Sequence, residues 1–307
     1  MDYNKYLPYI AGLSYSSIFG FSFMFTKISL GYIPPFQLLG FRFGVAAIVF
    51  TLLYLFKLIK LDYHDKNMGL LFLLVLFQPV FYFIFETMGI KYSSSSEAGL
   101  MISLIPVIVT MLAVIVLKER PSKKQLIFIM LSVSGVIFII LMKGQLDVKK
   151  HYFGMLLLGG AILMAGLYSI LSRLLSLNYK PVEITFVMIW SGAIVFNIIA
   201  LFMHQGDIME YLIPLQNFDL FLSVLYLGIL SSMVAFFLLN FTLSRIKASQ
   251  SSVFSNLVTV MSIIAGIVFL GENFFWFQII GGIMIITGVW GTNYYGKIEK
   301  RAEKISA

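Results

Sequence analysis

The sequence predicts an all-α integral membrane protein whose ten transmembrane helices form two five-helix repeats of inverted topology. Three observations support this fold class: the composition, the spacing of the apolar segments and an internal repeat. Hydrophobic residues make up 60% of the 307 residues, charged residues make up 12%, and the mean hydropathy is +0.94. Because soluble domains carry about 25% charged residues, this chain has too few charges to cover a water-exposed surface.

Composition also limits the chemistry that the chain can support. It contains no cysteine, which excludes disulfides and thiolate metal sites, and its histidines, His64, His151 and His204, are far apart in sequence and are expected in polar loops. The net charge of +8 would suit a nucleic acid, but no segment interleaves basic and aromatic residues as a nucleic-acid platform does. We therefore expect no metal, no cofactor and no nucleic-acid partner.

Apolar segments of roughly 20 residues, the length that crosses a bilayer as a helix, recur along the whole chain. The predicted helices lie near residues 6–30, 35–57, 68–90, 96–117, 124–142, 153–175, 182–203, 218–243, 248–270 and 275–295. The first apolar stretch, residues 7–26, is too long for the core of a signal peptide and is expected to remain as a helix. Ser122 and Gln125 have the spacing of a capping box at the start of the fifth helix.

Basic residues are distributed unevenly between the two sides of this arrangement. Of the 22 basic residues, Lys27 and Arg42 lie within spans, and 16 fall on the side of the N-terminus. The other side has only four: Lys91, Lys143, Lys149 and Lys150. Because cytoplasmic loops are enriched in Lys and Arg, we expect both termini in the cytoplasm of a multi-pass protein of the cell membrane, with a bacterial inner membrane as the expected setting.

The second half of the sequence repeats the first. At an offset of 146, the matches pair Pro35 with Pro181, Lys27 with Arg173, and residues 47–50 with residues 193–196. At an offset of 153, eight residues of the first half are identical to their counterparts in the second half: Ser96, Leu104, Val107, Leu117, Glu119, Gln125, Gly135 and Val136. Apolar helices can align by chance, but ordered matches that include Glu, Gln, Gly and Pro favour a repeat. The predicted halves are residues 1–147 and 148–307, which form one structural unit.

An inverted repeat has a mechanical meaning. Each half contains five predicted helices, an odd number, so the second half must lie upside down relative to the first. Two halves of the same shape that face opposite ways can exchange conformations and open one central site alternately to either side. This arrangement favours transport over catalysis.

Two stretches carry a family resemblance. Residues 85–98, which read FETMGIKYSSSSEA, are followed by Pro106 and by Leu-Lys-Glu at residues 117–119. Their counterparts in the second half are residues 248–252 and Leu-Gly-Glu at residues 270–272. Along nearly its full length the chain resembles the EamA-type ten-helix transporters of the drug/metabolite transporter superfamily.

The resemblance implies a five-plus-five inverted repeat with a central cavity lined chiefly by helices one to four and six to nine. It also implies packing roles for helices five and ten, and export or exchange of amino acids and related metabolites. In one place the two halves differ, because Thr259 stands where the repeat has Pro106, so the halves need not bend alike.

Three charged residues fall inside predicted spans. Glu86 lies in the third helix, where ionising an unpaired carboxylate is costly, and it is the candidate for proton coupling or for contact with a cationic substrate. The alternative is an interfacial carboxylate bonded to a serine or to Lys91. Lys27 and Arg42 could balance Glu86 or bind a substrate carboxylate, but snorkelling competes for Lys27 and structural ion pairing for Arg42.

Uncharged candidates are residues with hydrogen-bonding groups well inside spans. A cavity for amphipathic solutes needs such groups among apolar walls, although hydrogen bonding between helices is the alternative for each. These residues are Trp190, Tyr168, Asn240 and Asn256. Pro79 and Pro106 interrupt backbone bonding in helices three and four and are candidate hinges. Glu119 and Glu272 occupy equivalent helix ends and are expected to be structural.

The expected function is secondary-active export or exchange of small metabolites, most simply amino acids or related compounds, by alternating access, with proton coupling as a further hypothesis. A secondary mechanism is expected because the sequence has no nucleotide-binding motif. The alternatives are a multidrug or cation exporter, a passive channel or lipid scramblase, and a membrane-embedded lipid-modifying enzyme. The expected partners are a small-molecule substrate, the lipid bilayer and, as an open question, a second copy of the chain.

Overall fold

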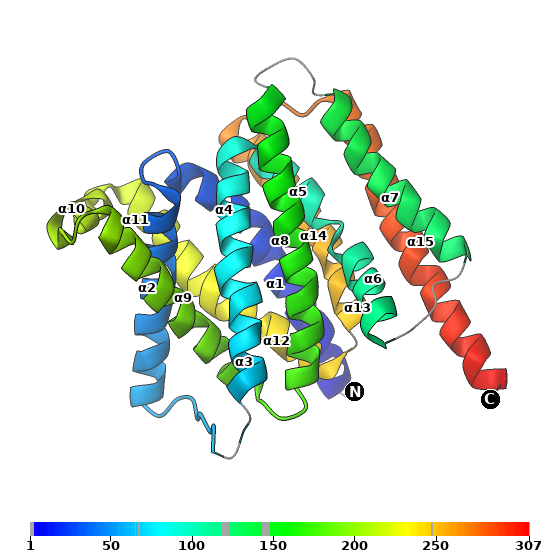
Figure 1. The fold of residues 1–307 in the computed structure, drawn as a ribbon, viewed down its shortest axis with the longest axis horizontal. Helices are drawn as coiled ribbons and strands as arrows, with labels where there is room; N and C mark the ends of the chain where they lie inside the picture. Colours follow the sequence, from blue (N-terminus) through cyan, green and yellow to red (C-terminus); the bar gives the residue numbers. More distant parts are fainter. Residues whose placement is uncertain are drawn as a thin grey trace.

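The computed structural model describes residues 3–64, 66, 68–117, 123–142, 148–246 and 248–306. Throughout these described residues the regular elements are helices, with no strand. Figure 1 shows them gathered into one bundle, with both ends of the chain on the same side. Six described segments are long and apolar enough to cross a membrane: Pro35–Leu55, Met68–Tyr92, Ser95–Leu112, His151–Leu175, Pro181–Met203 and Phe218–Arg245. The fold is therefore that of a multi-pass membrane protein.

The second helix of each half begins at a proline. Helix α1 (Tyr3–Ser29) is followed by α2 (Pro35–Leu55), and α8 (Val148–Leu175) is followed by α9 (Pro181–Met203). Proline suits this first position because its fixed φ fits a helix and its missing N–H would have no helical partner there. Helices α2 and α9 pack against each other along their length.

The third helix is broken in the middle. It consists of α3 (Met68–Val75), the π-helical turn η1 (Leu76–Phe81) and α4 (Tyr82–Tyr92). Gln78 has an extended backbone (φ −150°, ψ 118°), and Pro79 has no N–H to donate, so the run of helical hydrogen bonds stops at this point. The helix is thus interrupted where the sequence predicts it, and the hinge role of Pro79 stays a prediction.

The fourth helix is also divided. Helix α5 (Ser95–Ile102) ends before Ser103, and α6 (Ile105–Leu117) begins two residues later. Pro106 is thus in the first turn of α6, directly after the break, and not in the interior of a continuous helix. Ser122 and Glu119 lie outside the described residues, so the predicted capping box and the structural role of Glu119 stay predictions.

The second half has interruptions at corresponding places. Its third segment consists of α11 (Phe218–Leu225), the π-helix η3 (Tyr226–Ala235) and α12 (Phe236–Arg245). Its fourth consists of α13 (Ala248–Ser251), the short 3-10 turn η4 (Ser252–Phe254) and α14 (Ser255–Leu270). The connection that precedes α11 contains two elements that the sequence did not predict, α10 (Ile208–Leu212) and η2 (Ile213–Gln216).

Two predicted boundaries were wrong. Helix α8 begins at Val148, so His151 lies in its first turns and is largely buried, not in a polar loop. Helix α15 (Trp276–Ser306) continues beyond the predicted end at residue 295. In both cases a polar segment continues an apolar helix. The predicted ends were placed where the apolar segments end, so they missed these polar turns.

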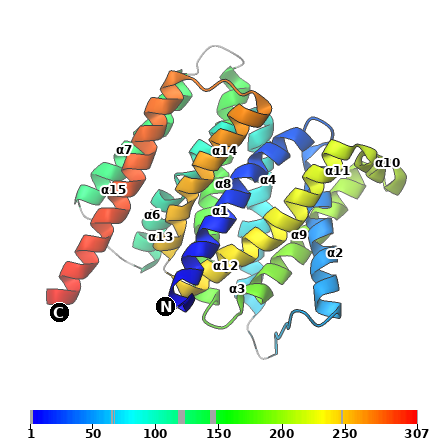
Figure 2. The ribbon, with the colours of Figure 1, turned by 180° about the vertical axis from the view of Figure 1, so that it is seen from behind.

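Helices α7 (Lys123–Met142) and α15 form a pair at one edge of the bundle (Figures 1 and 2). Glycines lie where the two backbones meet. A Cβ atom added to Gly135 would lie 2.7 Å from the carbonyl oxygen of Gly281, and one added to Gly288 would lie 2.6 Å from the carbonyl oxygen of Phe128. Small residues therefore set the closest approach of these helices.

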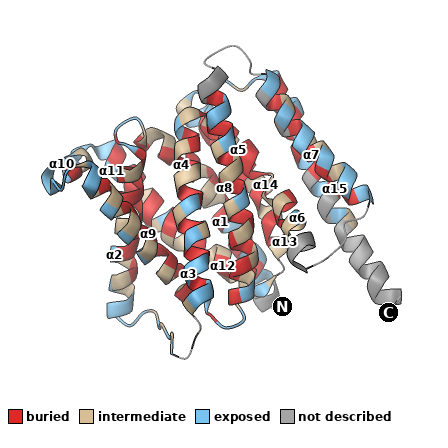
Figure 3. Ribbon diagram, viewed as in Figure 1, coloured by how far each residue is buried: buried red, intermediate tan, exposed pale blue. Residues whose placement is uncertain are grey.

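The outer faces of the helices are apolar. Figure 3 shows exposed positions on the outside of the bundle, and they include Leu156, Ile198 and Phe202, which is 86% exposed. Many serines and threonines are fully buried instead. A bundle with apolar side chains outside and hydroxyl groups inside fits a lipid environment, because lipid cannot satisfy the hydrogen bonds of polar groups.

Candidate functional site: a buried cavity between the halves

A cavity lies inside the bundle, between helices of both halves. The first half contributes α1, α2, η1, α4, α5 and α6, and the second contributes α8, α12, α13, η4 and α14. Including its opening, the cavity contains about 670 Å³ of space free of protein atoms. Most of its wall is apolar, and seven aromatic side chains line it: Tyr15, Phe19, Phe23, Tyr82, Phe83, Tyr168 and Phe236.

Four large polar side chains of the first half line this cavity. Gln78, Tyr82 and Glu86 are spaced four residues apart and all line the cavity, and Arg42 joins them from α2. All four side chains are nearly inaccessible to solvent, with exposed fractions between 2% and 9%. Gln78 and Tyr82 were not among the predicted site residues, although their spacing from Glu86 was a signal that could have found them.

Arg42 is held from three directions. Its Nε donates to the hydroxyl of Ser232 (2.7 Å), and its Nη2 donates to the hydroxyl of Ser231 (2.8 Å). Both serines belong to η3 of the second half. The guanidinium carbon also lies 4.3 Å from the ring centre of Phe83, which allows a cation–π contact. These partners are all neutral, so they fix the position of the charge without cancelling it.

Glu86 is the carboxylate of the cavity. Its Oε2 accepts a hydrogen bond from the hydroxyl of Thr87 (3.2 Å). Glu86 and Arg42 interact electrostatically, but within the described part of the chain no ion pair shorter than 4.0 Å joins them. The structure thus places a negative and a positive group in one cavity, close but not in direct contact.

Tyr168 and Asn240 belong to a network that joins three helices. The Tyr168 hydroxyl and the Ser172 hydroxyl both donate to Oδ1 of Asn240 at 2.7 Å, and Nδ2 of Asn240 donates to the Thr185 hydroxyl at 2.9 Å. Tyr168 lines the cavity with its ring. Asn240 does not line it, and its bonds to α8 and α9 assign it the helix-joining role that the sequence left as the alternative.

Lys27 lies away from the cavity and caps a helix end. Its Nζ donates to the carbonyl oxygens of Ile90 (2.9 Å) and Ser93, at the C-terminal end of α4. Arg173 does the same in the second half, where Nη1 donates to the carbonyls of Leu243 (2.7 Å) and Ser244 (3.0 Å) at the end of α12. Cations suit these positions because the last carbonyls of a helix have no backbone partner.

The remaining two candidates also lie outside the cavity wall. Trp190 is 37% exposed and its ring lies beside Phe186 on the outer face of α9. Asn256 is half-buried in α14, and its Oδ1 has no hydrogen-bond partner among the described residues. Of the predicted substrate or proton-binding residues, the structure therefore brings together Glu86, Arg42 and Tyr168.

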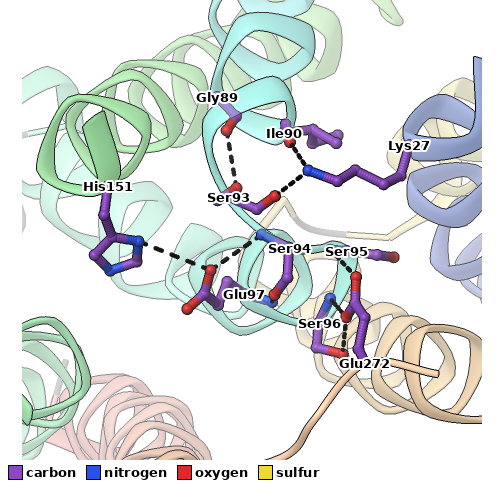
Figure 4. A network of polar contacts seen from close by, with 10 residues as sticks. All are labelled: Lys27, Gly89, Ile90, Ser93, Ser94, Ser95, Ser96, Glu97, His151 and Glu272. Carbon is purple, nitrogen blue, oxygen red and sulfur yellow. Dashed lines mark hydrogen bonds and ion pairs between the residues drawn. The ribbon is translucent and has the colours of Figure 1, made fainter. Parts of the chain in front are cut away.

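A polar junction lies at the end of the bundle opposite the chain termini, and Figure 4 shows its residues in detail. Ser94 and Glu97 form a capping box at the start of α5. Glu272, from the second half, accepts hydrogen bonds from the backbone N–H groups of Ser95 (2.7 Å) and Ser96 (3.0 Å) and from the Ser96 hydroxyl (2.6 Å). The sequence prediction that Glu272 is structural agrees with these contacts.

A second contact between the halves lies at the same junction. Nδ1 of His151, on α8, lies 4.0 Å from Oε2 of Glu97, and both side chains are largely buried. Neither residue was predicted to take part. Throughout the described ranges no group of three or more His, Asp or Glu side chains could hold a metal ion.

The end near the termini has its own contact between the halves. Glu183, fully buried at the start of α9, pairs with Lys66 (2.6 Å) and accepts a hydrogen bond from the backbone N–H of Asp62 (3.2 Å). The Tyr63 hydroxyl donates to the carbonyl oxygen of Glu183 (3.0 Å). Burial, together with the charge of Glu183, raises the pKa of Tyr63, which keeps this hydroxyl a neutral donor.

The fold and the cavity define a class of protein: a multi-pass helical membrane protein with charged and polar groups in a buried cavity, as carriers of small solutes have. The chain belongs to the EamA-like transporter family, which matches residues 7–141 and 152–294.

The chain is also similar to individual proteins that are named as transporters. The chain is 40% identical over 299 residues to the uncharacterized transporter YcxC of Bacillus subtilis (strain 168), a match that covers 96% of this chain and 95% of the relative. It is 24% identical over 295 residues to a probable amino-acid metabolite efflux pump of Salmonella typhimurium, covering 94% and 95%. A solved crystal structure shares the fold with a TM-score of 0.62 at 18% identity, covering 93% of this chain and 94% of its own.

Proposed function

We propose that the protein is a secondary-active transporter that exports or exchanges amino acids or related small metabolites by alternating access, with both termini in the cytoplasm and Glu86 as the proton-coupling group. The observation that carries this proposal is the buried cavity between the halves, which Glu86 and Arg42 line with opposite charges. An amino acid carries the same two charges on one small molecule. The Salmonella typhimurium relative, whose name specifies amino-acid metabolite efflux, supports this substrate class.

The division into two inverted five-helix halves, residues 1–147 and 148–307, is part of the proposal. It is supported by the direction of the first helix in each half, because α1 and α8 start at opposite ends of the bundle in Figure 1. It is also supported by equivalent caps: Lys27 binds the carbonyl of Ile90, and Arg173 binds that of Leu243. These pairs are related by the sequence offsets of 146 and 153.

The polar junction around Glu97 and Glu272 supports a proposal about the conformational state. With the termini in the cytoplasm, this junction lies on the outer side, where Glu272 of the second half accepts hydrogen bonds from the first turn of α5 in the first half. The cavity wall includes Ser251 and Ser252, from elements toward the end that holds the termini (Figure 2). We assign the structure to a state closed to the outside.

The direct test is counterflow in proteoliposomes. Vesicles loaded with an unlabelled amino acid are placed in a trace of the same compound carrying a radioactive label. A carrier accumulates label transiently above equilibrium and does so saturably, whereas a channel or scramblase only equilibrates it. A panel of amino acids and organic cations identifies the substrate class, and equilibration without overshoot for every compound would reject the carrier mechanism.

Replacing Glu86 with glutamine is expected to remove the pH dependence of this uptake. Glutamine keeps the size of the side chain and an oxygen for the Thr87 hydroxyl, but it cannot bind and release a proton. The uptake rate should fall by about tenfold or more, since a proton-transferring group typically contributes at least that much to a rate.

The matched control is Glu210→Gln, which removes a carboxylate from an exposed position in α10. It should leave both the rate and its pH profile as in the unmodified protein. If Glu86→Gln transports with the same rate and the same pH profile as this control, Glu86 is not the coupling group.

A further inference from the structure

The described residues that line the cavity carry two formal charges, and these are not held equally firmly. Among the described residues that line it, Arg42 is the one cation and Glu86 the one carboxylate. Arg42 is fixed by two hydroxyls of the second half and by the Phe83 ring. Glu86 receives one hydrogen bond, from its neighbour Thr87. The positive charge is therefore the more rigidly placed of the two.

The guanidinium keeps donors for a solute. Its described hydrogen bonds use Nε and Nη2, and within the part of the chain that the structure covers, Nη1 makes none. Arginine is always protonated under ordinary conditions, so this charge persists whatever the state of Glu86. The amide of Gln78 and the hydroxyl of Tyr82 belong to residues that line the same cavity and likewise make no described hydrogen bonds.

The direct partners of Arg42 are neutral, and this has a consequence for any charged solute. A carboxylate that enters can approach a fixed guanidinium in a setting of low dielectric constant, where charge-assisted hydrogen bonds are strong. An organic cation without a carboxylate meets the same charge as a repulsion. Such a cation can neutralise Glu86, but it then leaves Arg42 as an uncompensated buried charge, which is costly.

We propose that Arg42 determines the charge selectivity of the cavity, admitting solutes that carry a carboxylate, alone or beside an ammonium group, and rejecting organic cations that lack one. This inference rests on the proposed transport function and narrows its substrate class. It separates the amino-acid interpretation from the multidrug or cation exporter, because those two kinds of solute differ in the group that Arg42 binds.

The absence of cysteine from the sequence allows a test that needs no substrate. Ser169→Cys places one thiol on the cavity wall, where Ser169 bonds only to the carbonyl of Ala165 in its own helix. The probes are 2-sulfonatoethyl methanethiosulfonate, which is an anion, and 2-(trimethylammonium)ethyl methanethiosulfonate, which is a cation. Each forms a mixed disulfide with the thiolate and releases methanesulfinate. Both reagents react with the same thiolate, so the ionised fraction of the thiol affects both rates equally and drops out of their ratio. The ratio of the two rates therefore reports the electrostatic potential at the thiol.

Adding Arg42→Gln should lower the ratio of anion to cation rates at this thiol by at least about tenfold, the effect of a unit charge within about 10 Å at an effective dielectric constant of about 20. Arg42→Lys should change it little. Glu86→Gln should raise it, and this variant keeps the test decisive if Arg42→Gln fails to fold. The control thiol is Glu210→Cys, outside the cavity, where none of these substitutions should matter. An unchanged ratio at Ser169→Cys would overturn the inference.

A matched set of compounds then tests selectivity itself: L-leucine, its decarboxylated form 3-methylbutylamine, and its deaminated form 4-methylpentanoate. Binding is followed by thermal stabilisation of the purified protein. The two carboxylates should stabilise it more than the amine, and Arg42→Gln should reverse that order. Stronger binding of the amine to the unmodified protein would overturn the inference. A third outcome is that none of the three compounds binds while the ratio of anion to cation reaction rates at Ser169→Cys changes as expected. In that case the proposed amino-acid substrate class fails, and the charge selectivity assigned to Arg42 stands.

Discussion

Replacing Glu272 with alanine is expected to lower the melting temperature of the protein by many degrees. The Glu272 carboxylate accepts hydrogen bonds from the N–H groups of Ser95 and Ser96, which lie in the first turn of α5 and have no helical partner. Both residues are buried, so water cannot replace the carboxylate easily. A buried donor left without a partner costs about 1 to 3 kcal/mol, and this substitution orphans two donors at once.

The measurement is thermal unfolding of the detergent-purified protein. Glu272→Gln should have an intermediate effect because the amide retains one acceptor oxygen. The matched control is Glu210→Ala, which removes an exposed carboxylate from α10. This variant should have the same melting temperature as the unmodified protein. Equal melting temperatures for Glu272→Ala and Glu210→Ala would contradict the role assigned to Glu272.

Gly288→Ala should destabilise the protein by forcing α7 and α15 apart. The new Cβ would lie 2.6 Å from the carbonyl oxygen of Phe128 and from the backbone nitrogen of Ser132. These are backbone atoms, which cannot turn aside as the end of a side chain can. Overpacking of this kind typically costs about 1 to 3 kcal/mol. Because none of the described residues that line the cavity belongs to this helix pair, solute affinity should change much less than stability.

The control is Gly159→Ala in α8, where an added Cβ would meet no atom within 4 Å. This variant should be neutral or slightly more stable, because alanine is favoured over glycine in a helix by about 1 kcal/mol. The melting temperatures of the two variants, measured side by side, separate the packing effect from the effect of adding a methyl group. If both variants melt alike, close backbone contact does not hold α7 against α15.

The helices were predictable because membrane crossing imposes a length on apolar segments. Each predicted range contains helix in the structure, and the breaks at Pro79 and beside Pro106 follow from the missing proline N–H. The π-helical segment η3 was not predictable in the same way, since the serines that Arg42 binds there are not flanked by proline or another breaking signal. Elements α10 and η2 were not predicted because they are short and lie in a connection between two longer helices.

The site was partly predictable, for a different reason. A charge inside a span must avoid lipid, which led to Glu86 and Arg42, and both line the cavity. The depth of a residue in a span does not tell which neighbour it faces. Trp190 turns outward, Asn240 joins helices, and Lys27 reaches carbonyls at a helix end. Such choices depend on how helices rotate about their axes when they pack, and one sequence does not specify that rotation.

The caps made by Lys27 and Arg173 have a mechanical consequence. Each ties the first helix of its half to the last turn of the third, so that the two helices are pinned together at one end. Two helices that are fixed to each other at one end can move apart only at the other end. The last turn of α1, which holds Lys27, lies at the end of the bundle away from the chain termini, and the last turn of α8, which holds Arg173, lies at the end near them (Figure 1). The two halves thus have pivots on opposite sides, and the spreading of either one would widen the bundle toward a different face of the membrane.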